Sequence, residues 1–493
     1  MISEHLPALQ VVVPLISAPL IVVLRRNRLA WLIATAASWT ALAIAVSLAL
    51  RVGSGDVISY AIGNWPPPWG IEYRVDMLSA FVLVLVSLIA AIVMPYARTS
   101  VAAELPHDRQ YLFYSMYCLC LAGLLGITVT GDAFNLFVFL EISSLSSYVL
   151  IALGQKREAL FAALQYLILG TIGATFYIIG VGLLYLMTGT LNLADLAIRL
   201  SAVTEMRPVL AALVFITIGI GLKLALFPLH QWLPNAYAYA PSVVTAFLAA
   251  TATKVSVYVL LRFYYAVFGE TLVLRALPVD GLLLGLSAIA IVAMSLVAVF
   301  QTDLKRMFAY SSVAQIGYIT LGLTLVNVPG LTGAIAHLFN HGITKGALFL
   351  LAGCISLRCG ATSFDAMAGL ARRMPFTSFG VVLAGLSLIG VPATAGFTTK
   401  WYLIVGAMER GYWWLAGLIV ASSLIAVAYV WRFVEAAYFR PPGPDAPRRG
   451  EAPLSMLVPA WLLVAACIYF GIDTSFNIGF ARGAAELLLN GTP

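Results

Sequence analysis

Apolar runs long enough to cross a lipid bilayer contain four of the chain's six lysines: Lys223, Lys254, Lys345 and Lys400. A charge at the centre of a bilayer costs from ~3 to more than ~10 kcal/mol. Arginine keeps its proton in proteins, whereas a buried lysine can release it. Of the arginines only Arg432 lies more than two residues inside such a run, and it is near a helix end where it can reach toward water. This division indicates groups that bind and release protons, and structural ion pairs or lysines that reach the surface are the alternative.

Glu141 is the only carboxylate deep inside one of these runs, in the segment NLFVFLEISSLSSYVLIALG. On a helix its face continues through Ser144 and Tyr148. A nearby lysine would restore the charge of this isolated carboxylate, and Lys223 or Lys254 is the expected partner. A glutamate–lysine pair can act as a proton switch, because the lysine keeps its proton when the pair is close and can lose it when the pair opens.

His337, His341 and Lys345 follow one another at four-residue spacing in HLFNHGITKGALFL and therefore share one helix face. A single histidine in a core is usually just hydrogen-bonded, but two above a lysine in a membrane span favour a proton wire. The two histidines could also bind zinc, although no third ligand of the right type is evident. We therefore expect no metal site here.

Two of the apolar runs look interrupted, each beside a lysine. The residues concerned are Lys223, Pro228, His230 and Pro234 in GLKLALFPLHQWLP, and Pro392, Gly396 and Lys400 in GVPATAGFTTKWYL. Proline removes a backbone donor and disrupts the preceding turn. A simple kink would explain either interruption, but matching breaks in two halves indicate an inverted-repeat transporter with its ion path at the breaks. His230 and Lys305 are accessory candidates for this path.

The composition predicts an all-α polytopic membrane protein. Hydrophobic residues make up 62% of the chain and charged residues 10%, against roughly 45–50% and ~25% in soluble domains. A span needs ~20 apolar residues, and about fourteen such runs are present. They fall near 7–24, 29–50, 75–96, 111–129, 133–153, 159–188, 208–229, 241–264, 277–300, 306–326, 331–357, 375–405, 411–437 and 453–472. The length of the runs at 159–188 and 375–405 predicts tilt, a break or a short extra helix there.

The loops between these runs predict the orientation. With the N-terminus outside, the alternating loops hold fifteen basic residues inside and eight outside. Because short cytoplasmic loops are enriched in lysine and arginine, both termini are predicted to lie outside. Arg25, Arg26 and Arg28 follow the first apolar run, which indicates a retained first helix and not a cleaved signal peptide. The segment from 473 to 493 is expected to be a short tail.

The residue pattern gives no sign of catalysis or of a bound cofactor. The five cysteines form no CxxC pair, so neither an iron–sulfur centre nor zinc is expected. Gly219 and Gly221 lie in an apolar run before Lys223 and are interpreted as helix-packing glycines, not as a phosphate loop. The net charge of +7 is scattered over short loops, which argues against a nucleic-acid-binding face. We expect no catalytic residue, no metal and no cofactor.

Five segments, in a fixed order along the chain, carry a family resemblance. They are TGDAFNLFVFLEI, GLKLALFPLHQWLPNAYAYAPSVVTAFLAATATKVSVYVLLRF, DLKRMFAYSSVAQIGY, HLFNHGITKGALFLLAG and GVPATAGFTTKW. Together they resemble the proton-conducting antiporter-like subunits of Mrp-type cation/proton antiporters, respiratory complex I and membrane-bound hydrogenases, over roughly residues 75–435. The first segment most resembles the D subunit of the Mrp-type antiporters, and lysine at position 400 agrees with that subtype.

The resemblance assigns roles position by position. It matches Glu141 to the family's fifth-helix glutamate, Lys223 to the lysine of the broken seventh helix, Lys254 to the basic residue of the eighth, His337, His341 and Lys345 to the eleventh-helix group, and Lys400 to the terminal ionisable residue of the broken twelfth helix. It implies two inverted five-helix repeats, spans 4–8 and 9–13, each forming a half-channel. The single membrane domain would then comprise N-terminal helices (1–110), the two repeats (111–264 and 277–437) and a C-terminal helix with its tail (453–493).

The function that this resemblance implies is proton translocation in a multisubunit monovalent cation/proton antiporter, with sodium as the expected cation. The alternative is a proton-pumping subunit of a redox-driven complex, of the NADH:quinone oxidoreductase or membrane-bound hydrogenase type. A non-conducting scaffold is disfavoured because it has no use for four buried lysines. The expected partners are sibling membrane subunits in the inner cell membrane, and no nucleic acid.

Overall fold

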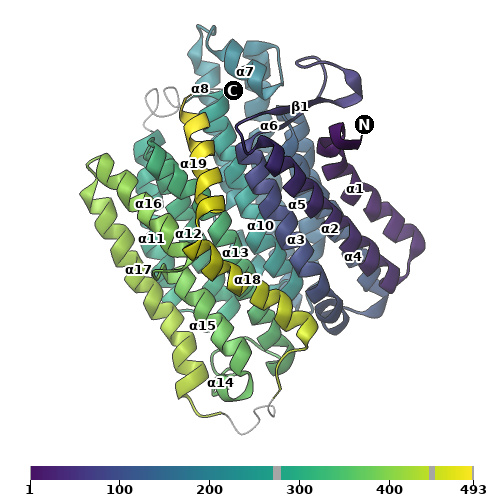
Figure 1. Ribbon diagram of the computed structural model, residues 1–493, viewed down its shortest axis with the longest axis vertical. Coiled ribbons are helices and arrows are strands. Elements are labelled where there is room, and N and C mark those ends of the chain that lie inside the picture. Colours follow the sequence, from purple (N-terminus) through teal and green to yellow (C-terminus); the bar gives the residue numbers. More distant parts are fainter. Residues whose placement is uncertain (1, 270–278, 443–449, 491–493) are drawn as a thin grey trace.

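The computed structural model describes residues 2–269, 279–442 and 450–490. Within these ranges the regular structure is helical apart from one antiparallel hairpin, β1 (Ile58–Ala61) with β2 (Glu72–Val75). Its register places Ile58 opposite Val75. Figure 1 shows the helices packed side by side as one bundle, with the hairpin at one end.

The helices fall into two consecutive groups along the chain. The first group contains α1 (Leu6–Leu24), α2 (Asn27–Val52), α3 (Met77–Glu104), α4 (Gln110–Val129), α5 (Ala133–Ala152), α6 (Arg157–Thr188), α7 (Leu193–Leu200), α8 (Met206–Leu224), α9 (Trp232–Tyr239) and α10 (Ser242–Leu261). The second group contains α11 (Val279–Val299), α12 (Leu304–Thr324), α13 (Val328–Cys359), α14 (Leu370–Arg373), α15 (Pro375–Ile389), α16 (Ala395–Glu409), α17 (Trp413–Val434), α18 (Leu454–Ile472) and α19 (Ser475–Leu489). Single turns are η1 (Ile2–Glu4), η2 (Ile62–Asn64) and η3 (His107–Arg109), and the π-helical turns η4 (Arg262–Val267) and η6 (Glu435–Phe439) extend α10 and α17.

The described residues include 12 helices that are individually long and apolar enough to cross a membrane. Two more crossings come from α12, which has 21 residues and many polar side chains, and from α15 and α16 together. The chain is therefore a multi-pass membrane protein, and its described helices are consistent with the prediction of about fourteen crossings. The even number brings the start of α1 and the end of α19 to the same end of the bundle, the upper end in Figure 1, which we call the termini side.

The C-terminal segment is not the short tail that the sequence suggests. α19 continues from α18 toward the termini side and packs on α3 and α13. Asn477 donates from Nδ2 to Oδ1 of Asn340 in α13 at 3.0 Å. Asp473 and Thr474 interrupt the apolar run, but Asp473 accepts a hydrogen bond from Ser475 N–H at 3.0 Å, and the chain resumes a helix there. The last crossing is thus built from two helices.

Each predicted repeat contains the same pair of backbone hydrogen bonds, between the start of its second helix and the residues after its third. The donors and acceptors are Ala133 N–H to Leu191 O and Leu193 N–H to Gly131 O in the first repeat, and Leu304 N–H to Thr362 O and Phe364 N–H to Thr302 O in the second. The second set lies 171 positions after the first, and the same shift carries α6 onto α13, each 32 residues long. α7 follows the first pair at the termini side and α14 follows the second at the opposite side (Figure 1), so the two repeats are inverted.

Both interrupted runs are broken helices. α8 and α9 are separated by residues 225–231, and α15 and α16 by residues 390–394. Each break begins with a residue in the left-handed conformation, Ala225 at φ 61° and Gly390 at φ 89°. Such a residue ends a helix because it turns the next carbonyl and N–H groups off the helix axis.

The four residues predicted to break these helices divide into two kinds. Pro228 and Pro392 lie in the breaks themselves. Pro234 and Gly396 lie instead in the first turn of the helix that follows, α9 and α16 respectively. A proline is tolerated there because the first N–H groups of a helix have no partner within it. The prediction of a break is thus confirmed, while two of its four markers belong to the restart of the helix.

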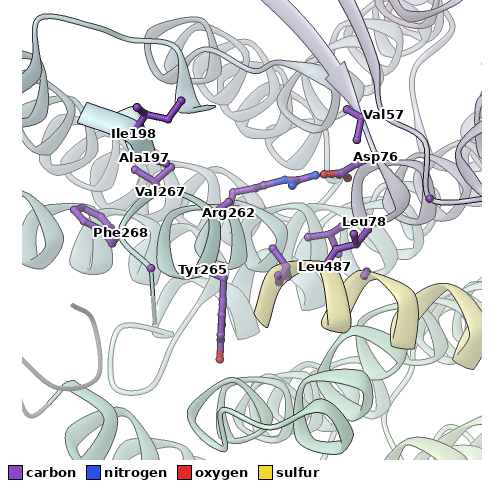
Figure 2. A pocket seen from close by; sticks show the side chains of 15 residues that line it. Val57, Asp76, Leu78, Ala197, Ile198, Arg262, Tyr265, Val267, Phe268 and Leu487 are labelled. Carbon is purple, nitrogen blue, oxygen red and sulfur yellow. Dashed lines mark hydrogen bonds and ion pairs between the residues drawn. The ribbon is translucent and has the colours of Figure 1, made fainter. Parts of the chain in front are cut away.

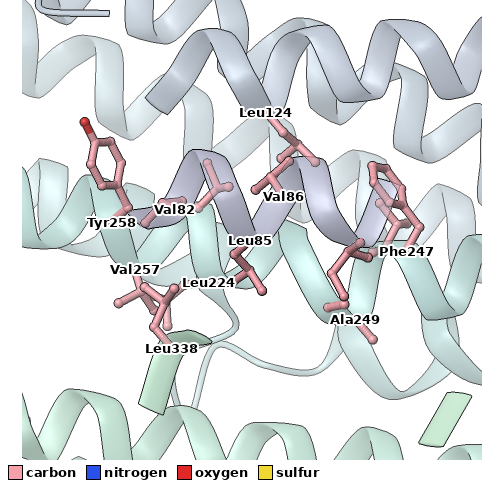
Figure 3. Close-up of a cluster of buried hydrophobic side chains, with 14 of the residues drawn as sticks. Val82, Leu85, Val86, Leu124, Leu224, Phe247, Ala249, Val257, Tyr258 and Leu338 are labelled. Carbon is pink, nitrogen blue, oxygen red and sulfur yellow. The ribbon is translucent and has the colours of Figure 1, made fainter. Parts of the chain in front are cut away.

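An apolar core lies between α3, α4, α10 and α13. Figure 3 shows part of it, with Leu124 of α4 beside Val86 of α3, and Leu85 on the opposite side of α3. Gly342 of α13 allows the close approach of α10, since a Cβ atom there would lie 2.9 Å from Ala250 O. Because this core is closely packed, polar groups in the middle of the bundle can interact only with the other polar groups that the helices bring beside them.

The packing of α8 on α6 gives a testable prediction. A Cβ atom at Gly219 would lie 2.6 Å from Gly173 O and 2.7 Å from Tyr177 N. Gly219→Ala should therefore destabilise the protein by about 1–3 kcal/mol, the usual cost of overpacking, measured as a lower thermal unfolding temperature in detergent. Gly285→Ala in α11 is the control, because nothing lies within 4 Å of its Cβ position. Equal unfolding temperatures for the two variants would contradict the tight α6–α8 contact.

Candidate functional site

Glu141 on α5 and Lys223 on α8 form a loose ion pair. Glu141 Oε1 lies 3.5 Å from Lys223 Nζ, and Nζ also donates to Ser144 Oγ at 2.7 Å, one turn further along α5. Of the two partners considered from the sequence, Lys223 and not Lys254 contacts the carboxylate. The Lys223 side chain is 3% exposed, but that of Glu141 is 25% exposed. The carboxylate is less deeply buried than expected because α5 presents part of its surface to the outside of the bundle.

The break after α8 positions Lys223. The lysine lies in the last turn of α8, where unpaired carbonyl groups make the helix end electronegative and favour a cation. Trp232 Nε1 at the start of α9 donates to Leu222 O at 2.8 Å and ties the two half-helices together. The ammonium group is therefore held at mid-bundle by a helix end that would be absent from an unbroken span.

A small polar cavity connects this pair with α10. Its volume is about 20 Å³, and its lining includes Ser144, Ser147 and Lys223 on one side and Ser256 of α10 on the other. A cavity holds one water molecule when its volume exceeds ~10–15 Å³. The space therefore suits a single water with hydroxyl partners, which is the geometry that a proton transfer away from Lys223 needs.

Lys254 of α10 is 1% exposed and turns back along its own helix. Its Nζ donates to Ala249 O at 2.5 Å and to Thr253 Oγ1 at 3.2 Å. α10 packs against α8 of the first repeat and against α13 of the second. Lys254 thus lies between the first repeat's ion pair and the basic residues of the second repeat.

His337 and His341 stack on α13 with ring centroids 5.6 Å apart and an interplanar angle of 8°. His337 is fixed at both nitrogens, by Thr399 Oγ1 and by Gln315 Oε1, each at 2.8 Å. In the part of the chain that the structure describes, neither ring nitrogen of His341 has a hydrogen-bond partner. The two histidines therefore differ in freedom: one is oriented by its neighbours and the other can accept or donate a proton.

Lys345 lies on the same face of α13 and is fully buried, with 0% exposure. Its Nζ leans toward α12, where it donates to Phe308 O at 2.7 Å and to Ser311 Oγ at 2.5 Å. The predicted alignment of this lysine with the two histidines is present in the helix, but its ammonium group contacts α12 and neither imidazole.

Lys400 lies in α16, just beyond the second break. Its Nζ donates to Ile389 O at 2.8 Å, the last carbonyl of α15, and to Ser423 Oγ of α17 at 2.9 Å. The ring of Tyr318 faces the same ammonium group at 4.8 Å from its centroid. The break therefore serves Lys400 as the first break serves Lys223, by exposing carbonyl groups at the end of a half-helix.

The two accessory candidates lie apart from one another. His230 is in the α8–α9 break and stacks on Phe227 at 5.4 Å. Lys305, placed in a loop by the sequence, belongs to the first turn of α12 and is buried. Its Nζ donates to Ser242 Oγ at 3.0 Å, beside a 450 Å³ pocket that Glu104 also lines. Only Lys305 is therefore near an opening of the bundle, on the side opposite the termini.

Several polar residues at the site were not predicted. Ser311, Gln315 and Tyr318 of α12 contact Lys345, His337 and Lys400 respectively, and Thr399 and Ser423 complete the contacts. The spacing of the three α12 residues at 311, 315 and 318 is that of one helix face, a signal that the sequence contains. The sequence contains no comparable signal for Thr399 and Ser423, because their role depends on which distant helix lies beside them.

The lysines differ in their counter-ions. Among residues 2–269, 279–442 and 450–490, Lys254, Lys345 and Lys400 form no ion pair with a carboxylate, unlike Lys223. The alternative that all four lysines are structural ion pairs therefore fails for three of them. Arg432 is partly buried, and its guanidinium donates to Val299 O and Gln301 O near the end of α11.

Comparison with known sequences shows which proteins this chain resembles. The family described as "NADH:quinone oxidoreductase/Mrp antiporter, TM" matches residues 130–426. NADH-quinone oxidoreductase subunit N of Desulforudis audaxviator is 44% identical over 488 residues, covering 95% of this chain and 96% of the relative. The D subunit of the Na(+)/H(+) antiporter of Bacillus subtilis is 29% identical over 484 residues, covering 98% of this chain and 97% of the relative.

Solved structures agree with the sequence relatives. A chain of the Mrp complex from Dietzia sp. matches with a TM-score of 0.92 at 27% identity, covering 100% of this chain and 98% of that chain. A chain of the membrane-bound sulfane sulfur reductase, an archaeal respiratory membrane complex, matches with a TM-score of 0.89 at 30% identity. The match covers 99% of this chain and 100% of that chain. The resemblance and the helical fold expected from the sequence are thereby confirmed.

The Lys223–Ser144 contact gives a second prediction. Ser144→Ala removes the 2.7 Å acceptor of the ammonium group. A hydrogen bond to a charged group is worth ~1.5–3 kcal/mol, so proton flux measured in membrane vesicles should fall about tenfold. Ser146→Ala is the control, since that buried hydroxyl donates to carbonyls of its own helix, Ile142 O and Ser143 O, and not to the Lys223 ammonium group. An equal fall in both variants would remove Ser144 from the site.

Proposed function

Because this chain belongs to the NADH:quinone oxidoreductase/Mrp antiporter family, we propose that it is the proton-translocating subunit of a multisubunit monovalent cation/proton antiporter. Protons are the species that this chain carries, and sodium is the cation for which the assembly exchanges them. The chain acts as a transporter subunit and not as an enzyme by itself.

One observation supports this proposal most strongly: three buried lysines have no carboxylate partner among the described residues. A permanently charged ammonium group without a counter-ion would cost several kcal/mol in the bilayer. The neutral form is therefore within reach of each lysine. A line of such groups, spaced across both repeats, is what stepwise proton movement needs.

The proposed path runs from the Glu141–Lys223 pair through the small hydroxyl-lined cavity to Lys254. From there it passes His341 and His337, which stack on α13, while Lys345 on the same helix face reaches α12. Thr399 and Gln315 lead from His337 to the region of Lys400 at the second break. At each step an ammonium or imidazolium group gives a proton to a neighbouring neutral base or water and is itself left neutral.

The loose ion pair is the proposed switch. At 3.5 Å the Glu141 carboxylate stabilises the Lys223 ammonium group, but the ion pair is longer than a strong charged hydrogen bond. If the carboxylate moves away, the ammonium loses its counter-charge and the proton can pass to the cavity beside Ser147. If it returns, Lys223 can take up a new proton.

A second function is favoured by one observation, the 44% identity to NADH-quinone oxidoreductase subunit N. On this alternative the same path serves a redox-driven complex, and electron transfer in partner subunits replaces the cation gradient as the driving force. The antiporter is preferred because relatives named as D subunits of antiporters match at 29–31% identity over nearly the whole chain, and the Mrp complex has a TM-score of 0.92.

Sibling membrane subunits are the proposed partners. The partly exposed Glu141 carboxylate lies on α5 among the exposed apolar side chains of Phe134, Val138, Leu145 and Val149. A carboxylate that faced lipid at this position would be costly, so a neighbouring subunit is the natural cover for this face. We place the complex in the inner cell membrane with the termini side outside, as the distribution of basic loop residues indicates.

The proposal predicts the behaviour of two Lys223 variants in everted vesicles. The host lacks its own antiporters and expresses this chain with its sibling subunits. Lys223→Ala should abolish the cation-dependent proton movement that an acid-interior dye reports. Lys223→Arg should fail as well, because arginine keeps the charge but does not release its proton. Full activity in the arginine variant would exclude Lys223 as a proton carrier.

Two further measurements complete this experiment. Lys156→Arg, an exposed loop substitution, is the control and should transport normally. Sodium, potassium and lithium are added in turn to identify the cation. An assembled complex that responds to none of them would favour the redox-driven alternative.

A further inference from the structure

α10 continues beyond Lys254 with two polar residues that the path above does not use, Tyr258 and Arg262. Lys254, Tyr258 and Arg262 follow at four-residue spacing and share one face of the helix, leading toward the termini side. The Tyr258 hydroxyl group donates a hydrogen bond of 2.9 Å to Thr128 O, near the end of α4. Arg262 Nε donates to the same tyrosine oxygen at 3.0 Å. Each residue toward the termini side is thus bonded to the one before it or to α4.

Arg262 also forms an ion pair with Asp76, and both side chains are largely buried. Asp76 is the N-cap of α3 and accepts a hydrogen bond from Ser79 N–H at 2.9 Å. Burial alone would raise the pKa of the Asp76 carboxyl, but the charge of Arg262 and the hydrogen bonds hold that pKa below its ordinary value. The carboxylate is therefore charged at neutral pH, and the pair fastens α3 to the end of α10.

Three spaces border α10 between the termini side and Lys223. The first is a 590 Å³ pocket at the termini side, in which Figure 2 shows the Arg262 side chain reaching Asp76. The second is a cavity of about 30 Å³ lined by Arg74, Thr130, Tyr258 and Arg262 among others. The third is the 20 Å³ cavity at Lys223.

Two polar contacts lie beside these spaces. The Arg262–Asp76 pair lies between the first and the second, since Arg262 lines both. Tyr258 lines the second space, and its hydrogen-bond partner Thr128 adjoins Ile127, which lines the third. On another flank α10 packs against the apolar core of Figure 3, in which Tyr258 is labelled.

We propose that Asp76, Arg262 and Tyr258 form a gate that separates the space at the termini side from the buried lysines, and that the gate is closed in this structure. The fixed positive charge of Arg262 repels protons and cations, as arginines do in selective pores. The ion pair holds that charge across the opening, and the tyrosine closes the second contact. The three residues act on protons through this barrier and do not carry them.

The proposal rests on the proposed function in one respect, that the groups behind the gate bind protons. It adds that the barrier toward the termini side is electrostatic and can be removed without touching the buried lysines. The 590 Å³ pocket gives the Arg262 side chain room to swing away when the pair opens.

Asp76→Asn is the first test. Asparagine caps a helix as well as aspartate does, so the start of α3 keeps its hydrogen bond while the ion pair is lost. The complete complex is reconstituted in liposomes, a proton gradient is imposed without any added cation gradient, and the passive proton leak is recorded. The leak should rise about tenfold, the change expected when a barrier falls by ~1.4 kcal/mol. A folded complex whose leak is unchanged would overturn the gate.

Asp195→Asn is the matched control. It removes the same charge from a more exposed pair, Asp195 with Arg199 at 2.9 Å, in the α7 helix that also lines the 590 Å³ pocket. The leak should stay at the level of the unmodified complex. A leak as large as that of Asp76→Asn would mean that any lost charge at this end opens the protein, and would overturn the specific role of Asp76.

A double variant separates gating from folding. Asp76→Asn with Arg262→Gln lacks the pair but leaves no unpaired buried charge, so the gate predicts that the leak persists. Recovery of a tight membrane in the double variant would assign the leak to the stranded arginine and overturn the proposal. Asp76→Asn with Tyr258→Phe should leak more than Asp76→Asn alone, and an equal leak would remove Tyr258 from the gate.

The leak assay also distinguishes the two proposals. It needs no cation exchange, so a complex that leaks in the Asp76 variant but never exchanges cations would support the gate and count against the antiporter. A complex that exchanges cations yet shows no leak in any variant would do the reverse.

Discussion

The cost of placing an ammonium group inside a bilayer is the constraint on which the rest of this structure depends. This cost is offset at Lys254, Lys345 and Lys400 by a hydrogen bond to a backbone carbonyl in place of a carboxylate. The acceptors are Ala249 O, Phe308 O and Ile389 O respectively. A carbonyl dipole stabilises a cation less than a full negative charge does, and it leaves the neutral amine tolerable. The helix breaks have the same physical purpose, because they expose carbonyl groups in the middle of the membrane where an unbroken helix would have none.

The two repeats share a backbone but not their chemistry. The shift of 171 positions that carries α6 onto α13 carries Glu141 onto Ser312, and it makes Tyr166 and Gly170 the counterparts of His337 and His341. The first repeat therefore holds an adjustable ion pair and the second holds a row of bases. The proposed switch and the proposed relay are thus separate devices built on one frame.

The sequence predicted much of this arrangement because the decisive signals are local. Apolar runs reveal the spans, and lysine or glutamate within them reveals the site, since the bilayer gives such residues few structural uses. The remainder depends on contacts between distant segments. The choice of Lys223 over Lys254 as the partner of Glu141, and the position of Thr399 beside His337, follow from helix packing. The second helix of the last crossing was missed because Asp473 and Thr474 look like the end of a span when the helix that follows them cannot be seen to pack on α3.

The number of crossings in each repeat has a consequence for the origin of the fold. A unit that crosses a membrane five times begins on one side and ends on the other. A tandem duplication of its gene therefore inserts the second copy upside down without any change in its sequence. Opposite access for the two halves would then be the automatic result of duplicating an odd-numbered unit, and later divergence needed only to exchange side chains at positions such as 141 and 312.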